Sequence, residues 1–388
     1  MKTIRFAVVG LGAMGLAHAR TILSGIVEEA ELTAVVSRNE THIAQLRACP
    51  GGEAVRAFDS IAQLAESGVC DAVLIATPHR LHVAQTLEAF DAGLAVLLEK
   101  PTGVYTAEVR ALNEAADRCG LAFGAMFNQR TNPLYRRMHD LVASGELGQI
   151  RRTSLIITDW FRAQSYYDSG AWRATWKQDG GGVLLNQAPH NLDLWQWICG
   201  MPSRVHAFCG LGRWHDIEVE DDVTAYVEYA NGATGTFVAC TGEAPGTNRF
   251  EISMDGGQLV CEQGHLTLSR TSVPVGSFLR EYPGGYGKPD VSVQEIAPQE
   301  ENPMHAGVIR AFARHMLYGE PMIADGREGL ASLMLANAML LSSFTGETIA
   351  LPMDEANDAR YAQMLADRAA NSRKRAFRPI EMDLGKSF

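Results

Sequence analysis

The chain has 388 residues, of which 34 are basic and 45 acidic, so its formal net charge is −11. That balance argues against nucleic acid or an anionic membrane as a general partner. Hydrophobic residues make up 46% and charged residues 20%, a globular composition that excludes extensive disorder. The length predicts two or three domains.

Targeting and redox signals indicate a cytoplasmic protein. No apolar run reaches the roughly 18 residues that a membrane-spanning helix requires. The first residues, Met1 to Arg5, enter a predicted strand directly and lack the apolar region of a signal peptide. The seven cysteines are an odd number without a Cys-x-x-Cys pair, which favours free thiols over disulfides or a structural zinc site.

The first 130 residues alternate short apolar runs with segments of helical periodicity. The runs show no polar alternation, as expected for strands of a parallel sheet that is covered on both faces. Repeated strand–helix–strand units of this size predict a doubly wound α/β domain over residues 1–130. The predicted strands are Ile4–Val9, Leu32–Val36, Ala72–Ala76, Ala95–Leu98 and Ala122–Phe127.

The remaining residues, 131–388, predict an α+β domain with a mostly antiparallel open sheet. Several short strands follow one another between Val205 and Ser269, and Asn231-Gly232 is a strong hairpin signal. Five acids between Asp216 and Asp222 predict a solvated loop. We expect the charged tail from Met353 to Phe388 to lie along the surface.

The first strand leads into a glycine-rich turn that is typical of dinucleotide binding. Gly10 permits the tight turn, Gly12 lets backbone amides approach a pyrophosphate, and Gly15 lets the helix and strand pack closely. The position between a strand and a helix makes this short motif more specific than the glycines alone. The predicted phosphate-binding loop is Gly10-Leu11-Gly12-Ala13-Met14-Gly15.

The end of the second strand bears on the choice of cofactor. An acid commonly binds the ribose 2′-hydroxyl of NAD there, but this chain has Ser37 and Arg38. A hydroxyl and a guanidinium accommodate a 2′-phosphate, which favours NADP over NAD. Alternatively, Arg38 stacks on the adenine or lies in solvent.

Two further strand ends, together with later motifs, resemble the glucose–fructose oxidoreductase, inositol dehydrogenase and rhizopine-catabolism family (Gfo/Idh/MocA). The resemblance covers nearly the whole chain, and the combination is far more specific than any one motif. The motifs are Thr77-Pro78-His79, Glu99-Lys100-Pro101, Phe127-Asn128-Gln129-Arg130, Ala171-Trp172-Arg173, Gly180-Gly181-Gly182, Asn186-Gln187-Ala188-Pro189-His190 and Asp193.

The resemblance implies metal-free hydride transfer between a secondary alcohol and a nicotinamide. Lys100 would lie beside the nicotinamide and bond the substrate oxygen, and His190 would take the hydroxyl proton. The family pattern has an aspartate four residues before the histidine, where this chain has Asn186, which puts an Asp–His dyad in doubt. Independently, Pro189 suits a first helical turn, and the helix dipole would keep His190 neutral as a base requires.

Other residues receive expected roles with alternatives left open. His82 is either cofactor-side or structural, and His305 either caps a helix or lies near the active-site mouth. The aromatic side chains Trp160 and Tyr167 either stack on a sugar ring or pack internally. The further cofactor-side residues implied by the resemblance are Thr77, Pro78, Glu99, Asn128, Trp172 and Arg173.

The predicted function is therefore an NAD(P)-dependent oxidoreductase that interconverts a secondary hydroxyl and a ketone on a sugar, glycoside or cyclitol. Two alternatives remain: a sugar- or nucleotide-sensing regulator on the same fold, and a reductase of a non-sugar carbonyl. The expected state is a homodimer or homotetramer, an expectation that rests on the resemblance. No metal, nucleic acid or membrane partner is expected.

Overall fold

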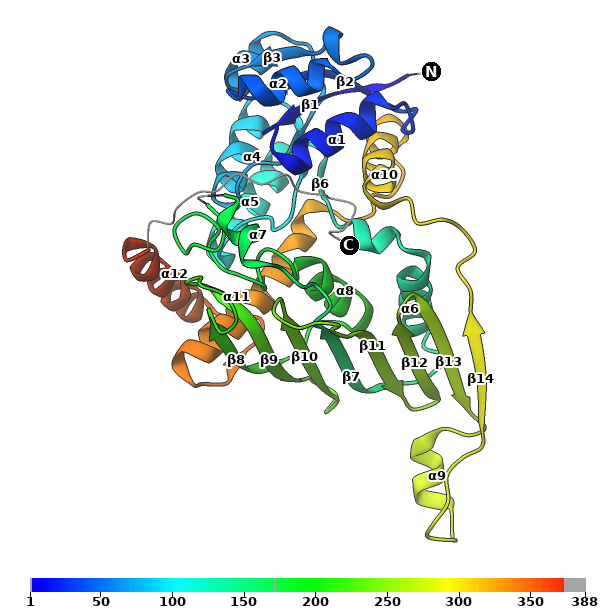
Figure 1. Cartoon of the computed structure of the whole chain (residues 1–388). Coiled ribbons are helices and arrows are strands. Elements are labelled where there is room, and N and C mark those ends of the chain that lie inside the picture. Colours follow the sequence, from blue (N-terminus) through cyan, green and yellow to red (C-terminus); the bar gives the residue numbers. More distant parts are fainter. Residues whose placement is uncertain (1, 171, 373–388) are drawn as a thin grey trace. The chain divides into compact units, whose positions relative to one another are not determined.

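In the computed structural model, which describes residues 2–170 and 172–372, the chain forms two compact units. The first unit consists of Met1–Thr131 and Asn302–Leu333, and the second consists of Asn132–Glu301 and the chain from Met334 onward. Figure 1 shows the returning segment as helix α10 (Met304–Tyr318), which packs against α1, β1 and β2 of the first unit.

The first unit is built on a six-stranded parallel sheet with the order β3-β2-β1-β4-β5-β6. This order is the one that dinucleotide-binding sheets use, with a crevice where the order reverses, between β1 and β4. The strands are β1 (Ile4–Val9), β2 (Ala30–Val36), β3 (Arg56–Phe58), β4 (Ala72–Ile75), β5 (Ala95–Leu98) and β6 (Phe123–Ala125).

Helices cover both faces of this sheet, and each face has its own hydrophobic core. On one face Phe6 packs with Phe312 of α10, their ring centroids 6.0 Å apart. On the other face Phe90 and Phe123 pack edge to face at 5.5 Å. Burial on both faces explains why these strands read as continuous apolar runs. The helices are α1 (Ala13–Leu23), α2 (Glu40–Arg47), α3 (Ile61–Glu66), α4 (His82–Asp91) and α5 (Thr106–Cys119).

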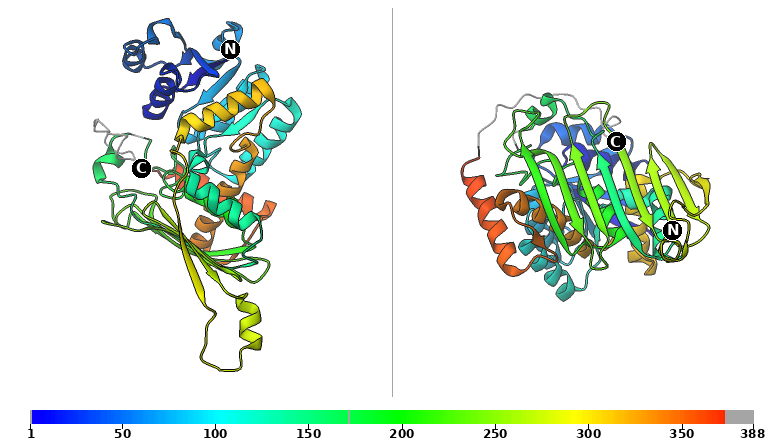
Figure 2. Two further views of the ribbon diagram at one scale, coloured as in Figure 1. Left: turned by 90° about the vertical axis from the view of Figure 1, so that its right-hand side faces the viewer. Right: turned by 90° about the horizontal axis from the view of Figure 1, so that it is seen from below.

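The second unit is built on a nine-stranded sheet, ordered β14-β13-β12-β11-β7-β10-β9-β8-β15, and several of its strands face the viewer in the right panel of Figure 2. Every neighbouring pair is antiparallel except β7 and β10, which run parallel. The α/β plus mostly antiparallel α+β fold class is therefore confirmed. The strands are β7 (Ile150–Ile157), β8 (Arg204–Leu211), β9 (Glu220–Glu228), β10 (Thr234–Cys240), β11 (Asn248–Met254), β12 (Gly257–Glu262), β13 (His265–Thr271), β14 (Val291–Ile296) and β15 (Ile349–Ala350).

One helix of the second unit, α8, packs on the sheet through a tryptophan. Trp195 of α8 donates its indole N–H to Oγ1 of Thr153 at 3.0 Å and stacks on Phe237 of β10. This anchoring fixes the helix that begins at Pro189. The helices are α6 (Pro133–Ala143), α7 (Gln164–Asp168), α8 (Pro189–Cys199), α9 (Val275–Glu281), α11 (Gly329–Thr345, which begins in the first unit) and α12 (Glu355–Ala370).

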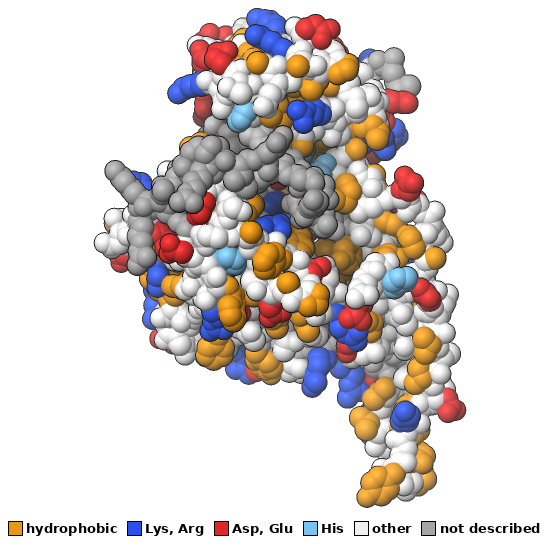
Figure 3. Space-filling model, in the orientation of Figure 1, with side chains coloured by type: hydrophobic (Ala, Val, Ile, Leu, Met, Phe, Trp, Pro, Cys, Tyr) orange, Lys and Arg blue, Asp and Glu red, His pale blue; other side chains and the backbone are white. Residues whose placement is uncertain are grey.

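The segment between β13 and β14 carries α9 and exposes large apolar side chains. Leu279 and Tyr286 are among them, and orange side chains gather on this segment in Figure 3. The predicted surface tail contains the regular helix α12, while residues 373–388 lie outside the described part of the chain. None of the described helices is long and apolar enough to cross a membrane.

Candidate active site

The glycine-rich loop joins β1 to α1 with the geometry that the sequence predicts. Gly10 has a φ of +89°, and an added Cβ would lie 2.7 Å from Cγ2 of Thr77. A Cβ on Gly15 would lie 1.8 Å from the carbonyl oxygen of Gly10. A Cβ on Gly12 would meet nothing within 4 Å. Gly10 and Gly15 are thus required by the fold, whereas the space at Gly12 suits a ligand that approaches the first turn of α1.

The segment after β2 places Ser37 and Arg38 on the way into α2. The backbone N–H of Asn39 donates to Oγ of Ser37 at 3.2 Å, and Asn39 in turn caps α2 by accepting from the N–H of His42. Arg38 is exposed. A charged side chain in this position is available to a group bound along the carboxyl ends of the strands.

Pro78 is exposed, whereas His82, the first residue of α4, ties together the loops that follow β4 and β5. Its Nδ1 lies 2.7 Å from the carbonyl oxygen of Pro101, and its Nε2 lies 2.8 Å from that of Thr77. Burial and the neighbouring His79 lower the pKa of His82 to about 4, although both carbonyls act in the opposite direction. His82 is thus held within the protein, and its contribution to a cofactor site is to shape the loop at Thr77.

Glu99 is the centre of a buried cluster that fixes the backbone at Lys100. Its Oε1 lies 2.6 Å from Nε2 of His18 on α1, and its Oε2 accepts the backbone N–H of Lys100 at 3.0 Å. Burial alone would raise the pKa of Glu99, but His18, His305 and Lys100 outweigh it and hold that pKa well below its usual range. The glycine-loop helix and the lysine loop are therefore linked through one ionised carboxylate.

His305, the second residue of α10, lies beside His18, with their ring centroids 5.2 Å apart. Burial lowers the pKa of His305 to about 4, and His18 and Lys100 add to this effect while Glu99 opposes it. Asn128 is fully buried, and its amide nitrogen lies 3.9 Å from the sulfur of Met304 at the start of α10. The returning helix α10 therefore contributes to this strand-end region, and His305, for which the sequence left a helix cap or a place near the site open, lies next to His18 there.

The second unit brings together several of the other predicted residues before α8. The guanidinium of Arg173 lies over the rings of Tyr166 and Trp172, at 4.5 and 4.6 Å from their centroids. Its Nη1 donates to the hydroxyl of Tyr166 at 2.8 Å, and that hydroxyl donates to Oδ1 of Asn186 at 3.2 Å. Ala171, which belongs to the same motif, lies outside the described residues.

His190 occupies the second position of α8, after Pro189 at the first, as the sequence predicts. It is buried, and Asp193 one turn later is buried as well and accepts a hydrogen bond from Nε2 of Gln196 at 3.1 Å. Lys100 belongs to the first unit and His190 to the second.

The two aromatic candidates for sugar stacking have different surroundings. Tyr167 is buried, its hydroxyl lies 2.7 Å from Oγ1 of Thr241, and its ring packs against Tyr166 and His215. Trp160 is partly exposed and lies under the guanidinium of Arg162. The hydroxyl of Tyr167 thus binds within the protein. The hydroxyl that contacts Arg173 and Asn186 is that of Tyr166, and nothing in the sequence distinguished these two tyrosines.

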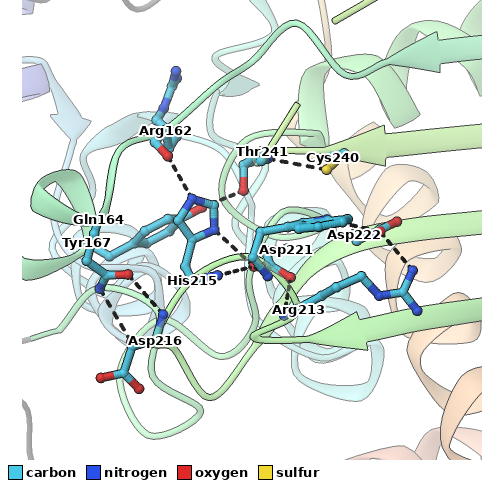
Figure 4. Close-up of polar contacts among 12 residues, drawn as sticks. Arg162, Gln164, Tyr167, Arg213, His215, Asp216, Asp221, Asp222, Cys240 and Thr241 are labelled. Carbon is cyan, nitrogen blue, oxygen red and sulfur yellow. Dashed lines mark hydrogen bonds and ion pairs between the residues drawn. The ribbon is translucent and has the colours of Figure 1, made fainter. Parts of the chain in front are cut away.

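The segment from Asp216 to Asp222 is not a solvated loop, so that prediction was wrong: its last three residues begin β9, and Glu220 and Asp221 are fully buried. Asp221 is fully buried and accepts backbone N–H groups from residues 213 to 215, and Nδ1 of His215 lies 2.9 Å from its carboxylate (Figure 4). Nε2 of His215 lies 2.7 Å from the carbonyl oxygen of Arg162. This network ties the loop to the segment that carries Tyr166 and Tyr167.

Glu220, also fully buried, holds the loop that leads to Asn186. Its Oε1 accepts the N–H groups of Gly182 at 2.8 Å and Leu184 at 3.0 Å. Burial raises the pKa of Glu220 to about 7, against the effect of these two amides. The sequence does not show that Glu220 is buried, because the amides that it accepts come from residues 36 and 38 positions earlier.

Among the described residues, no group of three or more His, Cys, Asp or Glu side chains could hold a metal ion. The seven cysteines, all within that part, are unpaired.

Two family models match the chain. The model of the oxidoreductase family with an NAD-binding Rossmann fold matches residues 4–127, and that of the GFO/IDH/MocA C-terminal domain matches residues 135–260. Together with the parallel sheet and the glycine loop, they indicate an oxidoreductase family whose first domain has the NAD-binding Rossmann fold. The chain belongs to the Gfo/Idh/MocA family.

Individual relatives show how far the similarity extends. The chain is 32% identical over 201 residues to trans-1,2-dihydrobenzene-1,2-diol dehydrogenase of Bos taurus, covering 51% of this chain and 56% of that enzyme. It is 26% identical over 302 residues to D-glucoside 3-dehydrogenase of Escherichia coli, covering 72% and 79%. For three of the curated relatives, including the bovine enzyme, the chain spans 54–58% of their length.

One solved structure is similar over most of the chain. The WlbA dehydrogenase from Bordetella pertussis, in complex with NADH and UDP-GlcNAcA, superposes with a TM-score of 0.75 at 27% identity. The match covers 91% of this chain and all of that one.

Proposed function

We propose that the protein is an NAD(P)-dependent oxidoreductase that interconverts a secondary hydroxyl and a ketone on a sugar, glycoside or cyclitol by hydride transfer. The observation that carries the proposal is the position of Lys100. It follows β5 at the carboxyl end of a parallel sheet whose strand order is that of dinucleotide-binding domains, and a buried carboxylate fixes its backbone.

The residues present fit a dinucleotide. The open space at Gly12 lies where the amides of the first turn of α1 can meet a pyrophosphate, and Gly10 and Gly15 keep the turn close to β1. Arg38 is exposed near the expected ribose position, which favours NADP over NAD. Leu11, Ala13 and Met14 would contribute backbone amides. A bound nicotinamide supplies or accepts the hydride.

Proton transfer falls to this chain's own side chains. We propose that Lys100 donates a hydrogen bond to the substrate oxygen and that His190 takes the hydroxyl proton. The first turn of α8 favours a neutral imidazole at His190, and a neutral imidazole is the form that acts as a base. Lys100 and His190 are proposed to share the role of the base.

Arg173 and Trp172 are proposed to contact the nicotinamide half of the cofactor. The guanidinium is held between two aromatic rings and anchored on the hydroxyl of Tyr166, so its direction is fixed before a ligand binds. A preorganised guanidinium loses less side-chain entropy on binding an anionic group. Because the net charge of the chain is −11, the phosphates must be attracted by local positive groups such as this guanidinium.

The names of the relatives support a cyclic secondary alcohol as substrate. One is a glucoside dehydrogenase, one a dihydrodiol dehydrogenase, and one binds a sugar nucleotide together with NADH. Because one relative is a dihydrodiol dehydrogenase, a ring compound other than a sugar is the second candidate class of substrate.

A substrate screen tests the proposal. Purified protein is incubated with NAD⁺ or NADP⁺ and with inositols, free hexoses, alkyl and aryl glucosides, or a trans-dihydrodiol, and the absorbance of the reduced cofactor is followed. Turnover of one of these alcohols is expected. Tight cofactor binding without any turnover would instead favour the sensing regulator.

We further propose a cytoplasmic homo-oligomer, either a dimer or a tetramer. The unpaired cysteines are consistent with a reducing compartment. Phe208 of β8 and Tyr226 of β9 are exposed, and a partner subunit would cover such side chains. Sedimentation of the purified protein checks the oligomeric state.

A further inference from the structure

Position 186 carries an asparagine where the family pattern has an aspartate, yet a carboxylate lies directly behind it. Asp179 is 1% exposed, and both of its carboxylate oxygens lie 3.2 Å from Nδ2 of Asn186. The two residues are seven positions apart, on either side of the glycine triplet. The negative charge that position 186 lacks is therefore present one hydrogen bond away.

The carboxylate decides which way the amide of Asn186 points. A carboxylate only accepts hydrogen bonds, so the NH₂ group of the amide faces Asp179 and the carbonyl oxygen faces away. That oxygen, Oδ1, accepts from the hydroxyl of Tyr166 at 3.2 Å and from Nε2 of Gln187 at 3.3 Å. Reversing the amide would place its oxygen against the carboxylate and lose these contacts.

Asp179 also holds the turn that carries Arg173. Its Oδ2 accepts the backbone N–H of Ala174 at 2.9 Å, and Ala174 has a φ of +52°, a left-handed conformation that is costly for a residue with a Cβ. Arg173 immediately precedes that residue and donates to the hydroxyl of Tyr166 at 2.8 Å. Arg173 and Asn186, two of the three side chains that hydrogen-bond the Tyr166 hydroxyl, are thus set by one buried carboxylate, and the third, Gln187, donates to it from Nε2 at 3.3 Å.

We propose that Asp179 is a positioning residue that has taken over the negative charge of the family's aspartate and acts through Asn186 and Tyr166. The expected effect of Asp179 on turnover rests on the proposed function. The position of its negative charge next to Asn186 is independent of that function. The charged groups that face this chain of hydrogen bonds include the buried carboxyl of Glu220 and the guanidiniums of Arg173 and Arg162, the latter 5.2 Å from the centroid of the Tyr166 ring.

A charge-swap experiment tests the proposal with Asn186→Asp, Asp179→Asn and the double variant, in the full-length protein. Asn186→Asp places two carboxylates about 3 Å apart, so one of them must keep its proton in the folded state. A carboxyl with a raised folded pKa loses stability as pH increases. The difference in thermal midpoint from the parent protein should therefore widen between pH 5 and pH 8.

The double variant restores one carboxylate facing one amide, with the two exchanged. We expect it to recover at least half of the midpoint lost in Asn186→Asp at pH 8 and to show no widening with pH. With the substrate found in the screen, its kcat should exceed that of Asn186→Asp by tenfold or more. The thermal midpoints measured across the pH range show whether Asp179 carries the negative charge next to position 186, even if no substrate is turned over.

Asn191 on α8 supplies the matched control, because it is also buried. Asn191→Asp should be destabilising, but adding Asp179→Asn to it should bring no recovery. An Asn186→Asp variant that follows the parent protein at every pH would overturn the proposal. A double variant whose loss equals the sum of the two single losses would overturn it as well.

Discussion

Nε2 of His18 lies 2.6 Å from Oε1 of Glu99, and both side chains are buried, although 81 positions separate them in the chain. His18 belongs to the helix that follows the glycine loop, and Glu99 bonds the backbone of Lys100. The lysine loop is thus joined to the helix that follows the glycine loop by a buried hydrogen bond between side chains.

Glu99→Gln removes the charge of the carboxylate while keeping nearly the same shape. Because the folded-state pKa of Glu99 is held below its unfolded value, its contribution to stability is present above about pH 4.3 and is lost as the pH falls further. The variant should lose on the order of 1 to 3 kcal/mol at pH 7 and less in acid. Urea unfolding at pH 3 to 7 measures this, and an equal loss at every pH would contradict it.

Glu220 should show the opposite pH dependence. Its folded-state pKa of about 7 lies above the unfolded value of about 4.3, so its contribution to stability is full below pH 4.3 and falls as pH rises to about 7. Glu220→Gln, whose oxygen can still accept the amides of Gly182 and Leu184, should remove that fall, on the order of 3 kcal/mol. Unfolding midpoints between pH 4 and 8 test it, with exposed Asp216→Asn as the control that should change nothing.

The glycine loop allows binding to be separated from folding. Gly12→Ala should leave the unfolding midpoint nearly unchanged, because the new methyl meets nothing within 4 Å, yet it should weaken NADPH binding roughly tenfold or more by crowding the pyrophosphate. Gly15→Ala, whose methyl would lie 1.8 Å from a carbonyl oxygen, should lower the midpoint itself. Calorimetry and fluorescence titration with NADPH separate these effects. Equal midpoint losses in both variants would refute the assignment.

Arg38 tests the cofactor preference. Arg38→Ala should weaken NADPH binding by about tenfold, because a charge-assisted hydrogen bond to the 2′-phosphate contributes roughly 1.5 to 3 kcal/mol. NADH has no such phosphate and should bind nearly as before. Dissociation constants for both cofactors provide the comparison, and equal weakening of the two would remove the preference for NADP.

The parallel sheet was predictable because buried strands are continuous apolar runs. The predicted strands Ile4–Val9 and Ala95–Leu98 agree with β1 and β5 residue for residue. By contrast, β14 is almost entirely exposed and α9 buries none of its residues, so neither leaves a hydrophobic pattern to detect.

The motif residues of the candidate site could also be named from sequence, because each motif is local. Their buried partners could not, since His18 with Glu99, or Asp179 with Asn186, meet only through the fold. The same reason accounts for Glu220, which the sequence places in a solvated loop but whose backbone partners, Gly182 and Leu184, are far away in the chain. Sequence patterns therefore named the candidate groups, and the structure added the contacts that hold them.

The most direct test of the central claim compares Lys100→Ala and His190→Ala with the parent protein. With the substrate from the screen, kcat should fall roughly 10²- to 10⁴-fold in each variant, because each removes a group proposed to bond the substrate or take its proton. The dissociation constant of NADPH should change by less than about threefold, equivalent to roughly 0.6 kcal/mol. Unchanged kcat in both variants would contradict the proposed active site.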